Sequence, residues 1–225
     1  MEGICLALAR RGYFAAAAHY QRLENLKRRN PLICCRSYEE GTTAYVHLLA
    51  QPQVNPERIG LLGFSIGGTH SLLIAASEPG IRAVVAYYPL ADAEKWLDHD
   101  RQSLVRSLRS RMVQRQLMKE LGVSHWEEAL PEVRAASPIR HVERIQAPVL
   151  LIHGEKDRTV PVGQSEDLYQ EFQSRGKSCQ LLILPRAGHT FNFRDEERAK
   201  ITWEKTLQFL DVHLQGEHPL PASGS

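Results

Sequence analysis

Leu61-Leu62-Gly63-Phe64-Ser65-Ile66-Gly67-Gly68 places a serine between two glycines, directly after an apolar run and before a helix-compatible one. This pattern is typical of a nucleophile elbow, a sharp turn from a strand into a helix that exposes a serine hydroxyl. Side chains at Gly63 and Gly67 are expected to collide with the neighbouring strand and helix, so glycine is required at both positions. The Ile66 N–H then begins a helix, where it can face a developing oxyanion.

The residues on either side of this turn favour an elbow over an ordinary strand-to-helix turn. Residues 55–58 form a turn signal, and residues 59–64 are an apolar run of the length of a buried parallel strand. After Ser65, apolar residues at helical spacing follow, and Pro79-Gly80 ends the pattern. Both the strand and the helix that an elbow requires are therefore predicted.

Two later apolar runs each lead into a loop with a residue that serine chemistry needs. Residues 147–154 predict a strand followed by Asp157, and residues 179–185 predict a strand followed by His189. Since catalytic groups of parallel sheets lie beyond the carboxyl ends of the strands, these residues are expected to meet Ser65 at one edge.

Acyl transfer needs a hydroxyl, an imidazole base and a buried carboxylate that holds the imidazole in one tautomer. Ser65, His189 and Asp157 supply these three groups, and their order along the chain is that of the α/β-hydrolases. Two other polar residues lie close by in the sequence. Glu155 is the alternative acid, and His70 is better explained by packing or capping than by catalysis.

Several motifs carry a resemblance to known families, and together they cover most of the chain. The later ones are Ala135-Ala136-Ser137-Pro138-Ile139, Ala147-Pro148-Val149-Leu150-Leu151-Ile152-His153-Gly154, Gln164-Ser165 and Gly188-His189. Through them, residues 132–214 resemble the catalytic domain of the prolyl oligopeptidase family. Through the elbow and Ala86-Tyr87-Tyr88-Pro89, residues 56–89 are similar to dienelactone-hydrolase-like proteins.

Both families have the α/β-hydrolase fold, a mostly parallel sheet with helices on both faces. The resemblance therefore implies this fold and a Ser65–Asp157–His189 triad. The family pattern Gly-x-x-Asp-x-x-Val-Pro selects Asp157 over Glu155, and the pairing of His153 with a glycine implies a structural role. Dienelactone hydrolases typically have cysteine in place of Ser65, so a lactone substrate does not follow from the resemblance. Prolyl oligopeptidases usually carry a propeller, for which no segment is seen here.

The beginning of the chain departs from the family pattern. Residues 1–11 predict a short helix, Gly12 its end, and residues 13–20 a strand, similar to elements that follow the first oxyanion loop. No His-Gly-Gly-like segment precedes them, and the first three strands of the usual eight have no counterpart. We expect an N-terminally shortened fold, in which the strands at 13–20 and 59–64 pair directly or the chain is an incomplete gene product.

Composition is that of a single globular domain, expected over residues 1–214, with 43% hydrophobic residues to fill a core. A helical insertion at about 93–133 is either a cap over the active site or a surface helix pair, and residues 215–225 predict a disordered tail. The formal charge of +2 argues against a nucleic-acid partner. No apolar run spans a membrane and no leader is recognised, so a cytoplasmic location is expected.

No metal or cofactor is expected, because the four cysteines lack metal-ligand spacing and are predicted to be reduced thiols. The main functional hypothesis is a serine hydrolase that cleaves a small-molecule ester, thioester, or small amide or short peptide through an acyl-enzyme. Two alternatives stay open. One is a serine peptidase of prolyl oligopeptidase type, and the other is a non-catalytic or truncated hydrolase-fold protein without a complete oxyanion hole.

Overall fold

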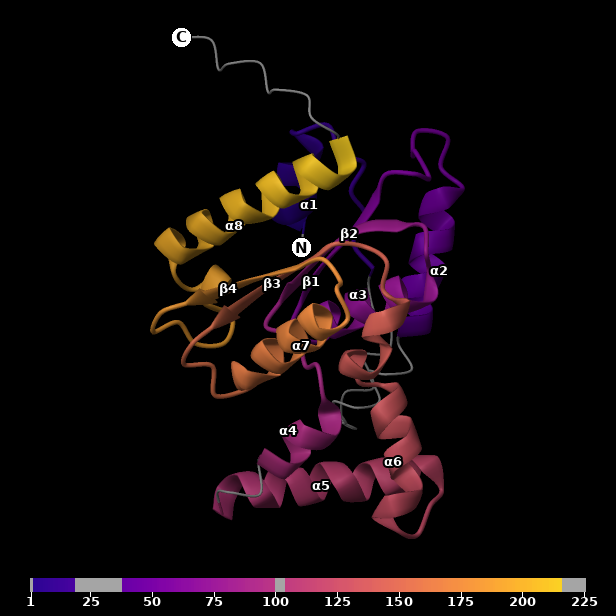
Figure 1. Ribbon diagram of the computed structural model, residues 1–225, viewed down its shortest axis with the longest axis vertical. Coiled ribbons are helices and arrows are strands. Elements are labelled where there is room, and N and C mark those ends of the chain that lie inside the picture. The colour runs from indigo at the N-terminus through magenta and orange to yellow at the C-terminus, as the bar shows by residue number, and fades with distance from the viewer. Residues whose placement is uncertain (1, 19–37, 100–103, 216–225) are drawn as a thin grey trace.

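Four parallel strands form the sheet: β1 (Ile59–Phe64), β2 (Ile81–Tyr87), β3 (Val149–Gly154) and β4 (Cys179–Leu184). They are hydrogen-bonded in that order, and each of the three pairings is parallel. The structure is a computed structural model, and it describes residues 2–18, 38–99 and 104–215 (Figure 1). Strands at 59–64, 147–154 and 179–185 are thus confirmed to within a few residues.

Helices cover both faces of the sheet, which explains why its strands are apolar along their length. On one face lie α2 (Tyr38–Leu49), α3 (Ile66–Ser77), α7 (Gly163–Ser174) and the 3₁₀ segment η4 (Pro138–Arg144). On the other lie α1 (Glu2–Ala9), α8 (Glu196–Leu210) and the π-helical turn η6 (Asp211–Gln215). Alternate residues of β2 enter the two cores, Val84 and Ala86 on the α3 side and Ala83 and Val85 on the α8 side.

The expected parallel sheet with helices on both faces is confirmed by this arrangement, and β1 is the edge strand of the described sheet. Among the described residues, β1 pairs with β2 alone. No helix in the described ranges combines the length and the apolar character needed to cross a bilayer.

The prediction of a strand at 13–20 is wrong for residues 13–18, which have no regular secondary structure. Residues 19 and 20 lie outside the described ranges. The expected direct pairing with 59–64 is therefore not observed. Tyr13 instead packs with Leu8 on the α8 side, and its hydroxyl donates to Asp211 Oδ1 at 2.7 Å. Because this anchor holds the segment over a face of the sheet, its backbone does not add a strand at the edge. Gly12, with φ of 86°, follows α1 as expected.

The expected insertion is helical and consists of α4 (Ala93–His99), α5 (Leu104–Leu121) and α6 (Trp126–Ala135). These helices form a lobe beyond the layers of the main domain (Figure 1). The lobe has its own apolar cluster, which includes Leu97, Leu117, Ala129 and Val133. Its first helix follows the carboxyl end of β2, the edge of the sheet that also carries Ser65.

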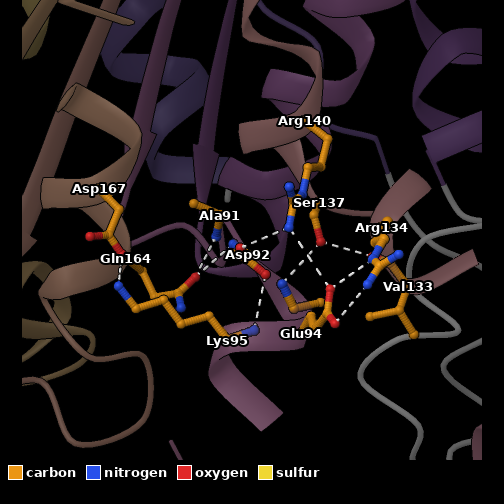
Figure 2. A network of polar contacts seen from close by, with 11 residues as sticks. Ala91, Asp92, Glu94, Lys95, Val133, Arg134, Ser137, Arg140, Gln164 and Asp167 are labelled. Carbon is orange, nitrogen blue, oxygen red and sulfur yellow. Dashed lines mark hydrogen bonds and ion pairs between the residues drawn. The ribbon is translucent and has the colours of Figure 1, made fainter. Parts of the chain in front are cut away.

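A polar network fastens the lobe to the main domain (Figure 2). Oε1 of Gln164, in the first turn of α7, accepts the backbone N–H groups of Ala91 and Asp92 at 3.0 and 2.7 Å. The Ser137 hydroxyl accepts the Ala93 N–H at 3.0 Å and donates to the Val133 carbonyl at 2.8 Å. Both Gln164 and Ser137 are buried. The Ser137 hydroxyl therefore joins the two ends of the lobe, and Gln164 ties the segment before α4 to the main domain.

Charged pairs surround these buried bonds (Figure 2). Arg134 donates to both carboxylate oxygens of Glu94, at 2.8 and 3.0 Å, and Lys95 pairs with Asp167. The basic side chains are half exposed, so solvent screens each pair and each adds little to stability. Of the tail expected at 215–225, Gln215 belongs to η6, and residues 216–225 lie outside the described ranges.

Candidate active site

Ser65 lies in the turn between β1 and α3 and has a strained backbone. Its φ of 54° and ψ of −121° fall in a region that non-glycine residues rarely adopt. Its N–H donates to the Tyr87 carbonyl at 2.9 Å, which ties the turn to the neighbouring strand. This is the local geometry expected of a nucleophile elbow.

The predicted steric requirement for glycine holds at one of the two elbow glycines. A Cβ at Gly63 would lie 2.1 Å from the Gly67 carbonyl oxygen, so no side chain fits there. The same expectation is wrong at Gly67, where a Cβ would meet no described atom within 4 Å. Gly68 makes the second close approach, since its Cβ would lie 3.3 Å from the carbonyl oxygens of Gly63 and Tyr87. The helix therefore contacts the strands through Gly68, one residue beyond the predicted position.

Ser65, His189 and Asp157 are brought together, as the sequence predicts. Nε2 of His189 lies 3.1 Å from Ser65 Oγ, and Nδ1 of His189 lies 2.6 Å from Asp157 Oδ2. The three residues follow the carboxyl ends of β1, β4 and β3. The Asp157 side chain has no exposed surface, whereas 18% of the His189 side chain is exposed.

The carboxylate of Asp157 is held on both oxygens. Oδ1 accepts the backbone N–H groups of Thr159 and Val160 at 2.8 and 2.9 Å, which leaves Oδ2 to face His189. Burial raises the pKa of Asp157, but hydrogen bonds from His153, His189 and the Val160 N–H outweigh burial and bring the pKa below its ordinary value. Asp157 is therefore an anion at neutral pH.

Two residues beside these three were not predicted from sequence to contact the site. The ring centroid of Tyr88 lies 4.6 Å from that of His189, and the Tyr88 hydroxyl donates to Asn192 Oδ1 at 2.6 Å. Burial raises the pKa of the Tyr88 phenol, so it stays a neutral donor. His153, expected to be structural, lies 3.5 Å from Asp157 Oδ2 through its Nε2. Both belong to motifs quoted above, but no spacing in the sequence indicates these contacts.

The remaining candidates fall outside this cluster or await a test. The Glu155 carboxylate accepts the Arg186 N–H at 2.8 Å, so it is engaged away from His189. His70 is buried within α3, in agreement with a packing role. Ile66 is the first residue of α3, where backbone N–H groups have no intrahelical acceptor. In the described ranges, no group of three or more His, Cys, Asp or Glu residues could hold a metal ion.

A cavity of about 280 Å³ opens beside the loop that carries His189. It is lined by residues 192–196 and Ala199, and includes Asn192, the acceptor of the Tyr88 hydroxyl. Phe193 is exposed there and packs against Phe64, the residue before Ser65, with ring centroids 5.3 Å apart. The exposed Phe193 ring therefore adjoins the elbow, at the edge of a cavity that is otherwise lined mainly by polar residues.

A serine in a strained strand-to-helix turn and a histidine beyond the last strand of a helix-covered parallel sheet define an α/β-hydrolase. A family model described as the prolyl oligopeptidase family matches residues 7–217. The chain belongs to the prolyl oligopeptidase family.

Two similar proteins agree with the expected resemblance to dienelactone-hydrolase-like proteins. A Bradyrhizobium sp. protein named as a 2-oxo-3-(5-oxofuran-2-ylidene)propanoate lactonase is 30% identical over 169 residues, which cover 73% of this chain and 54% of that protein. A Synechocystis sp. protein named among the carboxymethylenebutenolidases is 25% identical over 182 residues, which cover 78% of this chain and 58% of that protein. The chain thus spans little more than half of these two relatives.

Solved structures share the fold. Acylaminoacyl peptidase from Pyrococcus horikoshii superposes with a TM-score of 0.64 at 22% identity, covering 88% of this chain and 30% of that one. At this identity the likeness establishes the α/β-hydrolase fold alone.

Proposed function

We propose that this protein is a serine hydrolase that cleaves an ester, thioester or small amide or peptide bond through an acyl-enzyme on Ser65. The observation that carries the proposal is the continuous contact from Ser65 Oγ through both ring nitrogens of His189 to the buried Asp157 carboxylate. Membership of the prolyl oligopeptidase family supports the same class of chemistry.

In this mechanism the Ser65 hydroxyl gives its proton to His189 Nε2 while Oγ attacks the substrate carbonyl carbon. Asp157 holds the Nδ1–H of His189 and stabilises the imidazolium that forms. The C–O, C–S or C–N bond then breaks as His189 returns the proton to the leaving group. Water attacks the acyl-enzyme with His189 again as base, which releases the acid and restores the Ser65 hydroxyl.

The developing oxyanion requires donors close to Ser65. We assign one to the Ile66 N–H, because it begins α3 and helix N-termini stabilise negative charge. Loss of one donor from a complete oxyanion hole costs about 100- to 1,000-fold in turnover. The Ile66 N–H is thus expected to contribute a factor of this order to turnover.

For the substrate we propose small esters or short peptides. The name of the Bradyrhizobium relative supports the ester class, while names among the structural neighbours support acylated amino acids or peptides as a second candidate. The cytoplasmic location stays a prediction from sequence.

A substrate panel tests the proposal. Short-chain p-nitrophenyl esters, a thioester and an N-acylaminoacyl anilide would be incubated with the protein, with Ser65→Ala, and with the control Ser174→Ala, an exposed serine at the end of α7. Hydrolysis that is lost in Ser65→Ala and kept in the control supports the proposal. Equal rates in all three proteins would contradict it.

A further inference from the structure

Besides His189, a second imidazole lies beside the Asp157 carboxylate, namely the buried side chain of His153 in β3. The His153 side chain has no exposed surface. Its Nε2 lies 2.9 Å from the Val160 carbonyl oxygen and 3.5 Å from Asp157 Oδ2. The mechanism proposed above does not use this ring, although it contacts the loop on which the acid lies.

The surroundings of His153 determine where its proton lies. A carbonyl oxygen only accepts hydrogen bonds, and so does the ionised carboxylate, so Nε2 carries a proton. Nδ1 lies 2.7 Å from the Ser165 hydroxyl, the one hydrogen-bond partner of that hydroxyl in the described part of the chain. In the neutral ring with a protonated Nε2, Nδ1 accepts a hydrogen bond that the Ser165 hydroxyl donates. Ser165 therefore favours the tautomer in which the Nε2–H faces Val160 and Asp157.

The position of Ser165 explains a motif that the catalytic proposal leaves without a role. Gln164 and Ser165 are adjacent in the first turn of α7, and both are buried. Gln164 binds the backbone where the chain leaves β2, and Ser165 binds His153 at the end of β3. One turn of helix thus supports both segments that approach the site.

We propose that His153 is a positioning residue for the acid of the triad, held in one tautomer by Ser165. The proposal rests on the function proposed above. By holding the Val160 carbonyl, His153 fixes the loop whose Thr159 and Val160 N–H groups bind Asp157 Oδ1. The carboxylate then presents Oδ2 to His189 in a single orientation. His153 does not touch the reacting atoms and acts through Asp157.

The Nε2–H also makes the carboxylate a weaker base. Two titratable groups face His153, namely Asp157 in the loop after β3 and Tyr88 from the end of β2, whose ring centroid is 6.4 Å away. His189 lies across Asp157. Without the His153 N–H, the more basic carboxylate would stabilise the His189 cation more strongly. The acidic limb of the pH–rate profile, which reports His189, is then expected to move to higher pH.

The test measures the rate at which a fluorophosphonate labels Ser65, across the range in which imidazole titrates. His153→Leu removes both ring nitrogens, His153→Gln returns an N–H donor, and Ser165→Ala releases the ring. His125→Gln, an exposed residue before α6, is the matched control. Near-ultraviolet circular dichroism checks folding. If His153→Leu fails to fold, His153→Gln and Ser165→Ala decide, because they make smaller changes.

For His153→Leu we expect labelling to slow by about tenfold or more, yet by less than the roughly 10⁴-fold cost of disabling the triad acid itself. The acidic limb of its pH–rate profile is expected to move to higher pH. His153→Gln should recover much of the labelling rate and the pH–rate profile of the parent. Ser165→Ala should slow labelling by a smaller factor than His153→Leu.

Folded His153→Leu and Ser165→Ala variants with the parental rate and profile would overturn the positioning role and leave the proposed function standing. A folded parent that takes up no probe would instead overturn the proposed function, and the positioning role with it.

Discussion

The ring of Tyr88 packs against the imidazole of His189, with 4.6 Å between the ring centroids. Tyr88 follows β2 directly, with a positive φ of 39°, and its N–H donates to the Ile152 carbonyl at 2.7 Å. Its hydroxyl is held by Asn192 at the other end of the side chain. The proposed base therefore rests against a ring that is fixed at both ends.

Replacing Tyr88 by phenylalanine separates the ring from its hydroxyl. Tyr88→Phe keeps the aromatic ring that packs against His189 but removes the hydroxyl that donates to the partly buried Asn192 Oδ1. This loss is expected to cost about 1–2 kcal/mol of stability. Fluorophosphonate labelling of Ser65 should remain close to the parental rate. Chemical denaturation and labelling kinetics measure the two effects. A collapse of labelling in a folded Tyr88→Phe protein would show that the hydroxyl, and not the ring, supports His189.

The elbow glycines provide a matched pair of substitutions. Gly63→Ala places a Cβ against the backbone of Gly67, and we expect a loss of about 4 kcal/mol or failure to fold. Gly67→Ala meets no described atom and replaces a glycine within α3, so stability should rise by about 0.5–1 kcal/mol. Urea unfolding of both proteins checks this. Equal destabilisation by the two substitutions would refute the assignment of the close approach to Gly63.

The lowered pKa of Asp157 predicts a pH dependence of folding. Because the folded-state pKa lies below the ordinary value, the carboxylate stabilises the fold fully above about pH 4. That stabilisation is lost as the pH falls from there towards the folded-state pKa. Asp157→Asn lacks this contribution. The difference in free energy of unfolding between the parent and Asp157→Asn should shrink on acidification below about pH 4, and a constant difference would contradict the assignment.

The network that holds the helical lobe predicts unequal costs for its members. Gln164→Ala leaves the N–H groups of Ala91 and Asp92 without their buried acceptor, at about 1–3 kcal/mol for each group. Arg134→Ala removes an ion pair that solvent screens, so a smaller loss of stability is expected. Denaturant titration ranks the two. A larger loss from Arg134→Ala would mean that the surface charges, rather than the buried bonds, hold the lobe.

Much of the fold could be predicted because each strand is a short apolar run with turn residues at its ends. The meeting of Ser65, Asp157 and His189 follows from the same pattern, since the carboxyl ends of parallel strands share an edge. The same pattern wrongly predicted a strand at residues 13–18. A strand requires a paired neighbour, and Tyr13 instead binds Asp211, 198 residues away, which no local pattern reveals.

The neighbours of the site were harder to predict for a related reason. His153 and Ser165 come from a strand and from the helix that follows it, and their contact depends on how α7 packs against β3. The packing of Tyr88 on His189 likewise joins residues that follow β2 and β4. The close approach of α3 to the strands was predicted at Gly67 but occurs at Gly68. Which of the two faces the strands depends on the rotation of α3 about its axis, which the sequence pattern does not define.

Active-site labelling of the folded chain tests the proposed hydrolase most directly. The protein, Ser65→Ala and His189→Ala would be incubated with a fluorophosphonate, and the adduct located by peptide mass mapping. Modification confined to Ser65, absent from Ser65→Ala and strongly reduced in His189→Ala, is the predicted result. A folded chain that takes up no probe, or takes it up equally after His189→Ala, would contradict an activated serine at this elbow.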